Sequence, residues 1–573
     1  MIFAKNNNSK RKFQFFFAFF ISLFSNFSAQ VLNDSQLLKS DNWIYEALET
    51  LSLEAKNPIF LDTSPISVGE LKFYLSQIES QLDFENLSEG KEKLYLQIKE
   101  YLYTTKYLGK NSNLKIFPED SAAKISISTK INPEIYLRSN KEISPNLNYY
   151  YDDWFLSFPA IAGIAENVAL EIDLFFGKDY ESSINPDSIS NIPNSDSERE
   201  FEYPVFAYGN VGNNFGNWGF SATVGKEGFA IGDTKLGSII YNSTFETDAY
   251  SVLSAYSSNF KYNLIFSQVD SKKFLYFHNF NIKLFQFIKI GFTEGGLRNG
   301  PVELRFLNPA MFVHSFYSAK DYEKYEGNKN YCSYMGITLD IFPIKNLRLY
   351  ALWAQTELQT SSELKNQHAK MVPDGYGLQT GIDFLLPSKT DGFYKFNIEG
   401  LYTTPYLYIK QSPEWSMAKL EKKYGQSTDK ASWLGTPFGP DTFAISCSFG
   451  YEKPQKSSIE LQNLFLMKGQ IGLNTLLETT TIDGKKYPSY YPITAYELGV
   501  LDEKDAISEA RHKGLSGTIQ YRNDLSLSGE YYFFDFFKVA AEGTYTMIFN
   551  NNHEKGNFQQ GFELKLVCGF NLF

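Results

Sequence analysis

The chain has 573 residues, and 54 lysine and arginine residues against 65 aspartate and glutamate residues give it a net charge of −11. Nucleic acid is therefore not an expected partner, because phosphate binding requires a basic face. Aromatic residues make up 17% of the chain and cysteine occurs only three times, which excludes a disordered chain and a disulfide-stabilised scaffold. After residue 30 no apolar run approaches the ~20 residues of a membrane-spanning helix.

The first 29 residues have the pattern of a secretory signal peptide. An apolar stretch of twelve residues, Phe13–Phe24, leads to small residues ending at Ala29, where we expect cleavage. The positive charges that precede this stretch are Lys5, Lys10, Arg11 and Lys12. A retained membrane anchor is the alternative, but the apolar stretch is too short to span a membrane. Residues 1–29 are therefore expected to be removed on export.

Residues 30–122 are expected to form a helical segment in the periplasm. Between Asp41 and Leu108, apolar residues recur at helical spacing in three stripes. Each stripe follows a residue suited to capping a helix, namely Asp41, Ser67 or Ser88. Three short helices hold too few residues for a large core of their own, so we expect them to pack on the rest of the chain.

From residue 123 to residue 573 the apolar period changes to two, which predicts β-strands. In one such strand Ile398 lies on the apolar face and Glu399 on the polar face. Cys447 and Cys568 lie on the apolar faces of their own strands, so no disulfide is expected. Eighteen strands are predicted, at residues 124–138, 146–158, 167–176, 202–212, 216–224, 245–256, 260–269, 273–284, 286–294, 331–342, 346–357, 374–386, 393–408, 441–452, 456–468, 514–535, 537–549 and 559–573.

The connections between these strands alternate in length. Short turns occur at Phe285, 343–345, 453–455 and Phe536, whereas the long connections are 177–201, 225–244, 295–330, 409–440 and 469–513. A soluble sandwich would show the same alternation of polar and apolar residues, but tight turns on one rim and long loops on the other are typical of outer-membrane barrels. We therefore predict a mainly β protein of the outer membrane, a transmembrane antiparallel β-barrel of about 18 strands with a small N-terminal helical bundle. Membrane lipid and the barrel-assembly machinery are its expected partners.

Several segments, taken in this order behind a signal peptide, resemble the Wzi family of capsule-assembly outer-membrane proteins. They are Asp41-Asn42-Trp43, Pro65-Ile66-Ser67, Leu275–Glu294 with Phe277-His278, Leu304–Pro309, and Ile341–Tyr350. The resemblance covers most of the mature chain and includes no strict catalytic signature. It implies an eighteen-stranded barrel with a helical bundle at its periplasmic end and a lumen blocked by folded-in loops. It also implies a lectin-like role in binding or assembling surface polysaccharide.

Two predicted surface loops carry residue types that bind sugars, because aromatic faces stack on sugar rings and carboxylates accept hydrogen bonds from hydroxyl groups. The glycan-binding candidates are Glu414, Trp415, Asp429 and Trp433 in loop 409–440, and Tyr487, Tyr490 and Tyr491 in loop 469–513. The alternative is that these aromatic side chains pack the loops themselves or belong to the aromatic belt at the membrane interface.

The connection 295–330 contains too many large apolar residues for a loop left in water. We expect it to fold inward as a plug, with Asn308-Pro309 at a turn and Phe312 among the apolar groups. Arg305 would then pair with an inward-facing carboxylate. An extra hairpin in the barrel wall is the alternative.

Catalytic signatures do not accompany these features. The five histidines are scattered, and HExxH, GxSxG, Walker and paired CxxC motifs are absent from the sequence. We therefore expect no enzyme activity, no metal site and no cofactor. A transport pore remains the alternative function: an open porin, or a hydrophobic-substrate channel whose helical N-terminus enters the barrel as a hatch.

Overall fold

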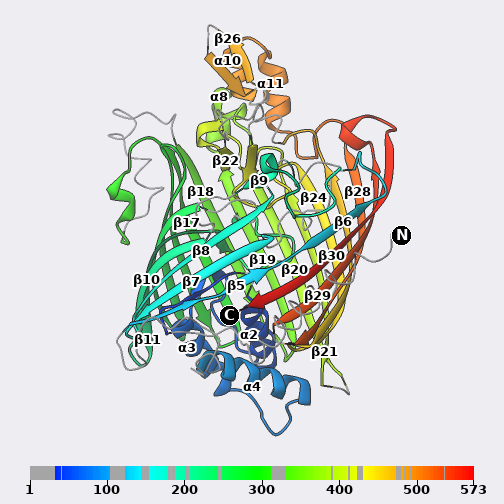
Figure 1. Ribbon diagram of the computed structural model, residues 1–573. Coiled ribbons are helices and arrows are strands. Elements are labelled where there is room, and N and C mark those ends of the chain that lie inside the picture. Colours follow the sequence, from blue (N-terminus) through cyan, green and yellow to red (C-terminus); the bar gives the residue numbers. More distant parts are fainter. Residues whose placement is uncertain are drawn as a thin grey trace, which may run out of the picture.

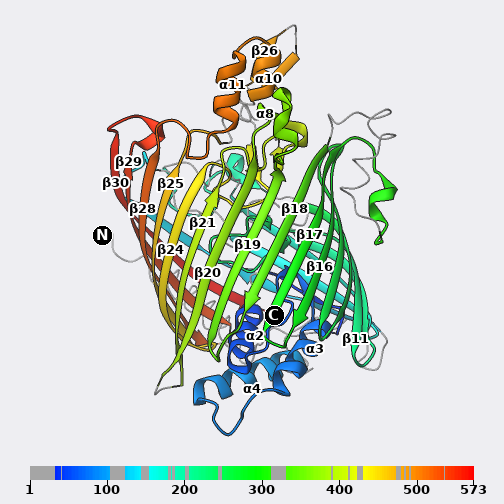
Figure 2. The same ribbon diagram turned by 180° about the vertical axis from the view of Figure 1, so that it is seen from behind.

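The computed structural model describes residues 33–40, 42–103, 123–143, 154–178, 182, 187–200, 206–242, 248–310, 331–388, 391–410, 413–421, 430–472, 479–482, 485–488, 492–534 and 536–572. They form a closed barrel of tilted antiparallel strands with helices beyond both ends (Figure 1). The reverse view in Figure 2 shows the same wall continuing around the back. In this part of the chain no helix is both long enough and apolar enough to cross a membrane. The predicted signal peptide lies outside the described residues.

The barrel sheet has 21 strands that make eighteen wall positions. Three short strands, β4 (Ala123–Ile127), β5 (Thr129–Ile131) and β6 (Glu134–Arg138), share one position, and β9 (Arg199–Glu200) only extends β8. The other wall strands are β7 (Leu156–Ile164), β8 (Val168–Lys178), β10 (Phe206–Asn214), β11 (Trp218–Glu227), β14 (Asp248–Ser257), β15 (Phe260–Asp270), β16 (Lys273–Leu284), β17 (Ile288–Asn299), β18 (Tyr331–Ile341), β19 (Leu347–Glu357), β20 (Gly375–Pro387), β21 (Phe393–Thr403), β24 (Thr442–Lys453), β25 (Ser457–Lys468), β28 (Gln520–Phe534), β29 (Phe537–Phe549) and β30 (Phe558–Leu572).

Each wall position overlaps one predicted strand, and the first and last positions close the barrel. β30 pairs with β5 and β6, while β4 and β5 pair with β7. Two predicted strands were too long. The segment predicted at 393–408 leaves the wall after Thr403, and the one predicted at 514–535 joins the wall only at Gln520.

Cross-strand pairing confirms that the wall has an apolar outer face and a polar inner face. On β21, Ile398 is 39% exposed, whereas Glu399 is fully buried. Ile398 pairs with the exposed Cys447 of β24, and Glu399 pairs with the buried Ser446. Residues paired directly across antiparallel strands share a face, so the apolar set faces outward on both strands.

Three helices close the end of the barrel that carries the short turns: α2 (Trp43–Ala55), α3 (Val68–Glu79) and α4 (Glu89–Tyr103) (Figure 1). The side chain of Ser67 caps α3 by accepting a hydrogen bond from the backbone N–H of Glu70, as predicted. The cap of α2 is Asn42, whose side chain accepts a hydrogen bond from the backbone N–H of Ile44 at 3.1 Å, and the predicted cap Asp41 lies outside the described residues.

The helical bundle takes part of its core from the barrel, as the sequence predicted. The buried faces of α2, α3 and α4 pack in one cluster with three residues at the barrel rim, Phe342, Leu385 and Phe393. Leu48, Leu71 and similar residues of this cluster are fully buried. Burying one such apolar side chain contributes about 1.5–3 kcal/mol. The bundle is therefore held to the rim by apolar packing.

Buried ion pairs add polar contacts between the bundle and the inner wall. Arg348 of β19 pairs with Asp340 of β18 at 2.6 Å, and it donates a hydrogen bond to the carboxyl group of Glu49 of α2 at 2.6 Å. Lys261 of β15 pairs with Glu70 of α3 at 2.6 Å, and both side chains are at most 3% exposed. Removing one partner of such a pair leaves an uncompensated buried charge and typically costs about 3–5 kcal/mol. These pairs fix the orientation of the helices inside the rim.

The topology can be tested with inserted tags. Pro343 lies in the turn between β18 and β19, where the Asn346 backbone N–H donates to Leu53 of α2 at 2.8 Å. A tag near Pro343 should therefore face the periplasm and stay unlabelled on intact cells, whereas tags near Gln426 or Asp483, in long loops at the opposite end, should be labelled. Labelling of the Pro343 tag on intact cells would show the reverse orientation.

The outer face of β21 gives a second prediction. Ile398→Arg should destabilise the barrel in lipid by about 2–4 kcal/mol if residue 398 lies near the bilayer midplane, because the charge would face hydrocarbon. Denaturant titration of protein folded into lipid vesicles measures this cost, with Ile398→Leu as the control of similar volume. Equal unfolding free energies for the two variants would contradict the assignment of this face to lipid.

A pH dependence follows from Glu49. Burial and the neighbouring carboxylates of Asp233 and Asp383 raise the pKa of Glu49 to about 8, while Arg348 acts in the opposite direction. In the unfolded chain Glu49 has its ordinary pKa of 4.5, so the folded state binds the extra proton between these values. The resulting stabilisation is complete below pH 4.5 and is lost as the pH rises through 8.

Hydrogen–deuterium exchange of α2 amides, corrected for intrinsic rates, should therefore show weaker protection as the pH rises across this window. Glu49→Gln should remove most of the dependence, because the amide carries no titrating proton. The exposed Glu92 of α4 offers a control, since Glu92→Gln should respond to pH as the wild type does. A Glu49→Gln protein with the wild-type response would rule out this residue as the cause.

Candidate functional site

A segment between β11 and β14 enters the lumen. It is termed the plug loop (residues 228–242) and contains β12 (Ala230–Ile231) and β13 (Tyr241–Asn242). β12 pairs on one side with β13 and on the other with β2 (Thr63–Ser64), which precedes α3. The large apolar side chains of the plug loop are at most 5% exposed: Phe229, Ile231, Leu236, Ile239, Ile240 and Tyr241. The sequence analysis placed this segment among the outer loops, and the structure instead places it inside the barrel.

Polar residues of the inner wall bind the backbone of the plug loop. The Glu399 carboxylate accepts hydrogen bonds from the N–H groups of Lys235 at 2.8 Å and Leu236 at 3.1 Å. The Gln379 side chain accepts from the Ile239 N–H at 3.0 Å and donates to the Gly237 carbonyl at 3.1 Å. Because buried backbone groups need partners, these two side chains determine how the loop sits against β20 and β21.

A second inserted segment comes from the connection between β21 and β24. It is termed the mouth loop (residues 404–441) and contains η6 (Pro413–Trp415), β22 (Ala418–Glu421) and β23 (Lys430–Trp433). The Tyr408 hydroxyl donates to the Ile239 carbonyl at 2.6 Å, and the Asn242 N–H donates to the Leu434 carbonyl at 2.6 Å. The two loops share one apolar core with inward-facing wall residues. They occupy part of the lumen together.

The glycan-binding candidates of the mouth loop differ in how far they are exposed. Trp433 is 4% exposed, and its ring centroid lies 6.0 Å from that of Tyr408 in the common core. Trp433 therefore packs the loop, which was the alternative considered for it. The prediction that Trp433 is an accessible platform for a sugar ring is wrong. Trp415 is half-buried at the edge of the same core, and Glu414 beside it is exposed. No described residue accepts a hydrogen bond from the buried indole N–H of Trp415.

The other loop candidates are not brought to a defined place. Asp429, Tyr490 and Tyr491 lie outside the described residues, and so does the side chain of Tyr487, whose backbone belongs to β27 (Lys485–Pro488). Of the predicted set, Glu414 and Trp415 therefore remain as candidates that the structure describes, and the role of Asp429, Tyr487, Tyr490 and Tyr491 stays a prediction.

Short helices stand above the mouth: α8 (Gln367–Lys370), α10 (Pro492–Glu497) and α11 (Glu503–Ala510) (Figure 1). Arg511 ties α11 to the connection before β20 through an ion pair with Asp374 at 3.0 Å. The Tyr406 hydroxyl of the mouth loop donates to Glu509 of α11 at 3.0 Å. The outer loops thus form a connected cap on the rim opposite the helical bundle.

The described part of the connection after β17, up to residue 310, lies outside the lumen, which corrects the predicted inward plug for these residues. Its described part contains η3 (Leu304–Leu307), and Nε2 of His278 lies 2.9 Å from the Phe306 carbonyl. Phe277 of β16 belongs to the core inside the lumen. Because successive residues of a strand point to opposite faces, its neighbours Tyr276 and His278 point outward. Phe306 packs against Tyr276 with ring centroids 5.2 Å apart. Residues 300–307 therefore form an outer strap over the wall, at the periphery of the barrel in Figures 1 and 2.

Polar residues on the outward face explain why the strap lies there. Arg305, expected to pair with an inward-facing carboxylate, instead pairs with Glu303 of its own segment at 2.7 Å. Glu303 also accepts from Arg298 of β17 at 3.1 Å, and Asn308 is exposed. Arg298 lies on the same outward face of β17 as Ile290, and yet it is only 2% exposed. An uncovered guanidinium facing hydrocarbon would be costly, and the strap provides its partner. Phe312, the remaining plug candidate, lies outside the described residues.

Part of the inner wall remains in contact with solvent. Glu460 of β25, Ser528 of β28 and Glu542 of β29 pair in one row across the inner face and are all half-buried. By contrast, the inward-facing Asn279 and Gln379, which lie near the plug loop, are fully buried. The plug therefore covers one side of the inner wall, and the polar wall opposite is only partly covered.

In the described ranges, no group of three or more histidine, cysteine, aspartate or glutamate residues is arranged to hold a metal ion. The three cysteines, Cys332, Cys447 and Cys568, are free. The lack of a disulfide agrees with their predicted positions.

Comparison with known proteins gives a likeness in fold. Wzi of Escherichia coli, described as a carbohydrate-binding β-barrel involved in group 1 capsule assembly, superposes with a TM-score of 0.55 at 11% identity, covering 93% of this chain and 99% of Wzi. OprD of Pseudomonas aeruginosa (TM-score 0.38, 9% identity, 80% and 97% coverage) and OmpT of Vibrio cholerae (0.30, 8%, 79% and 99%) are more distant. No protein-family model and no curated sequence matches the chain. The closed eighteen-stranded wall and the likeness in fold to Wzi place the chain among the β-barrel proteins of the outer membrane.

Proposed function

We propose that this protein binds surface polysaccharide through its outer loops and holds or assembles it at the cell surface. The observation that carries the proposal is the common core of the plug loop and the mouth loop, which narrows a barrel wide enough to be a pore. A protein selected for diffusion would keep that passage open, whereas a binding protein needs a rigid base for its loops. The likeness in fold to a carbohydrate-binding barrel supports the same function.

Trp415 and Glu414 are the residues that we propose to contact the glycan. The indole face offers a stacking surface for a sugar ring, and the exposed carboxylate of Glu414 can accept hydrogen bonds from sugar hydroxyls. A sugar oxygen close to the indole could also accept the N–H that no described residue uses. A buried donor without an acceptor costs about 1–3 kcal/mol, so a ligand that supplies one gains affinity. We propose binding and not catalysis as the role of this site.

A glycan array probed with purified protein tests this proposal. Trp415→Ala should weaken binding to any retained glycan by about tenfold or more. Truncating an aromatic anchor of a binding site typically costs more than about 1.4 kcal/mol of binding free energy, which corresponds to a tenfold change in affinity. Trp218, 50% exposed beside the short turn at the periplasmic end, provides the matched control as Trp218→Ala. No glycan retained by the wild type, or equal loss in both variants, would contradict the proposed site.

A channel with an N-terminal hatch is the second candidate. The partly covered inner wall around Ser528 and the insertion of the helical bundle into the barrel end favour it. Planar-bilayer recordings separate the two functions: the wild type should be silent if the loops block passage. The double variant Gln379→Ala/Glu399→Ala should open the barrel and raise conductance, because it removes the side chains that bind the plug backbone.

The control for this recording keeps the plug and changes the opposite wall, as in Ser528→Ala. Large steady conductance of the wild type would favour the channel. A double variant that still migrates as a heat-modifiable barrel but stays silent would show that these two side chains do not hold the lumen closed.

A further inference from the structure

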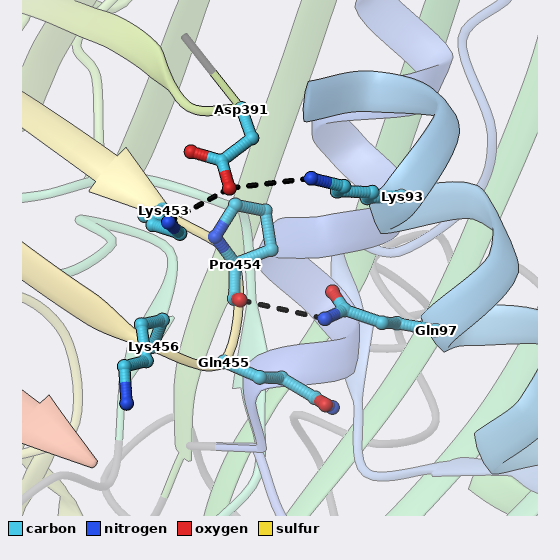
Figure 3. A pocket seen from close by; sticks show the side chains of 7 residues that line it. All are labelled: Lys93, Gln97, Asp391, Lys453, Pro454, Gln455 and Lys456. Atoms are coloured by element: carbon cyan, nitrogen blue, oxygen red, sulfur yellow. Dashed lines mark hydrogen bonds and ion pairs between the residues drawn. The ribbon is translucent and has the colours of Figure 1, made fainter. Parts of the chain in front are cut away.

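A pocket of about 270 Å³ lies at the periplasmic rim, where α4 meets two short turns of the barrel. It is lined by Lys93, Gln97, Asp391, Lys453, Pro454, Gln455 and Lys456. Figure 3 shows that these residues come from three places: α4, the connection between β20 and β21, and the turn between β24 and β25. None of them belongs to the outer loops, so the pocket is separate from the site proposed above.

Positive charge exceeds negative charge in the pocket, although the chain as a whole is acidic. Three lysines line it against a single carboxylate, that of Asp391. One oxygen of Asp391 holds Lys93 at 3.2 Å and Lys453 at 2.7 Å (Figure 3). Glu89 of α4 also pairs with Lys93, at 2.8 Å, which leaves a net charge of about one positive unit. An anion entering the pocket would therefore be attracted.

The lysines retain hydrogen-bonding capacity for such an anion. Each ammonium group carries three donors. Lys453 donates to Asp391, while Lys456 donates to the Tyr532 carbonyl at 3.1 Å with its ammonium 4.5 Å from the Tyr531 ring centroid. Hydrogen bonds from Lys453 and Lys93 hold the pKa of Asp391 below its usual range. The pocket is thus a preformed arrangement of charged groups at neutral pH.

Gln97 adds an acceptor to this cationic site. Its amide nitrogen donates to the Pro454 carbonyl at 3.4 Å. Its amide oxygen Oε1 is buried, and no described residue donates a hydrogen bond to it. A buried acceptor without a donor is unfavourable. A ligand that fits the pocket would therefore carry a negative group for the lysines and a hydroxyl or amide N–H for Gln97.

We propose that this pocket binds one acidic saccharide unit from the periplasm, a sugar carrying a carboxylate or a phosphate group. Lys453 and Lys456 contact the anionic group, and Gln97 accepts a hydrogen bond from a sugar hydroxyl. Neutral sugars lack the charge, and simple anions lack the array of hydroxyl groups around it. The pocket thus selects for both features at once.

Binding of small probes to the full-length protein in detergent tests the proposal. Glucuronate and glucose 1-phosphate should bind at low ionic strength in saturation-transfer NMR, and glucose should not. Added salt should weaken binding, since the charges are close to the surface. Lys453→Gln/Lys456→Gln should weaken glucuronate binding by about tenfold or more, because charge-assisted hydrogen bonds are lost.

Matched variants keep the test decisive, with heat-modifiable migration as the check on folding. Lys99→Gln is the control, since Lys99 lies on the same helix but pairs with Glu79 at 3.0 Å and does not line the pocket. Gln97→Ala should weaken glucuronate more than inorganic phosphate. Glucose binding as tightly as glucuronate, or a double variant that binds like Lys99→Gln, would overturn the proposal. Phosphate equal to glucuronate with no effect of Gln97→Ala would overturn the saccharide assignment.

Discussion

The width of the barrel is the constraint on which the rest of this structure depends. Eighteen strands enclose a lumen that their own side chains cannot fill, so any obstruction must come from additional chain. That chain brings backbone N–H and carbonyl groups into a low-dielectric interior, where each needs a partner. Glu399 and Gln379 supply such partners, because they point inward from the wall directly at the plug loop. A wall with an apolar lumen face could not hold the loop in this way.

Arg348 joins the three parts of the molecule at one point. Its guanidinium contacts Asp340 of the wall, Glu49 of the bundle and the backbone carbonyl of Asp233 in the plug loop. A guanidinium has five donors in a fixed plane, which suits a position where partners arrive from several directions. β2 and β12 pair nearby in the same lumen. The N-terminal helices and the plug loop are therefore neighbours in one polar network, although more than 120 residues separate them in sequence.

The wall could be predicted from the sequence because lipid on one side and polar surroundings on the other impose a strict period of two. The path of the loops could not, because it depends on complementary groups that lie far away in sequence. The apolar content that suggested a plug at 295–330 was equally present in the plug loop, at Phe229, Ile239 and Ile240. The two segments differ in the wall residue that binds their backbone. The inward-facing Gln379 binds the plug loop, and the outward-facing His278 binds the strap. Trp433 illustrates the same limit, since its type fits a sugar platform and a loop core equally well.

The outer strap makes the outer surface of the barrel differ from one side to the other within the plane of the membrane. Over β15 to β17 the surrounding lipid meets a second layer of protein, with Leu304 74% exposed on it. Around β28 and β29 it meets the bare wall, where Leu525 and Leu527 are exposed. Neighbouring proteins and lipids therefore encounter a different contour on each flank. For its lateral neighbours the barrel is a body with distinguishable sides.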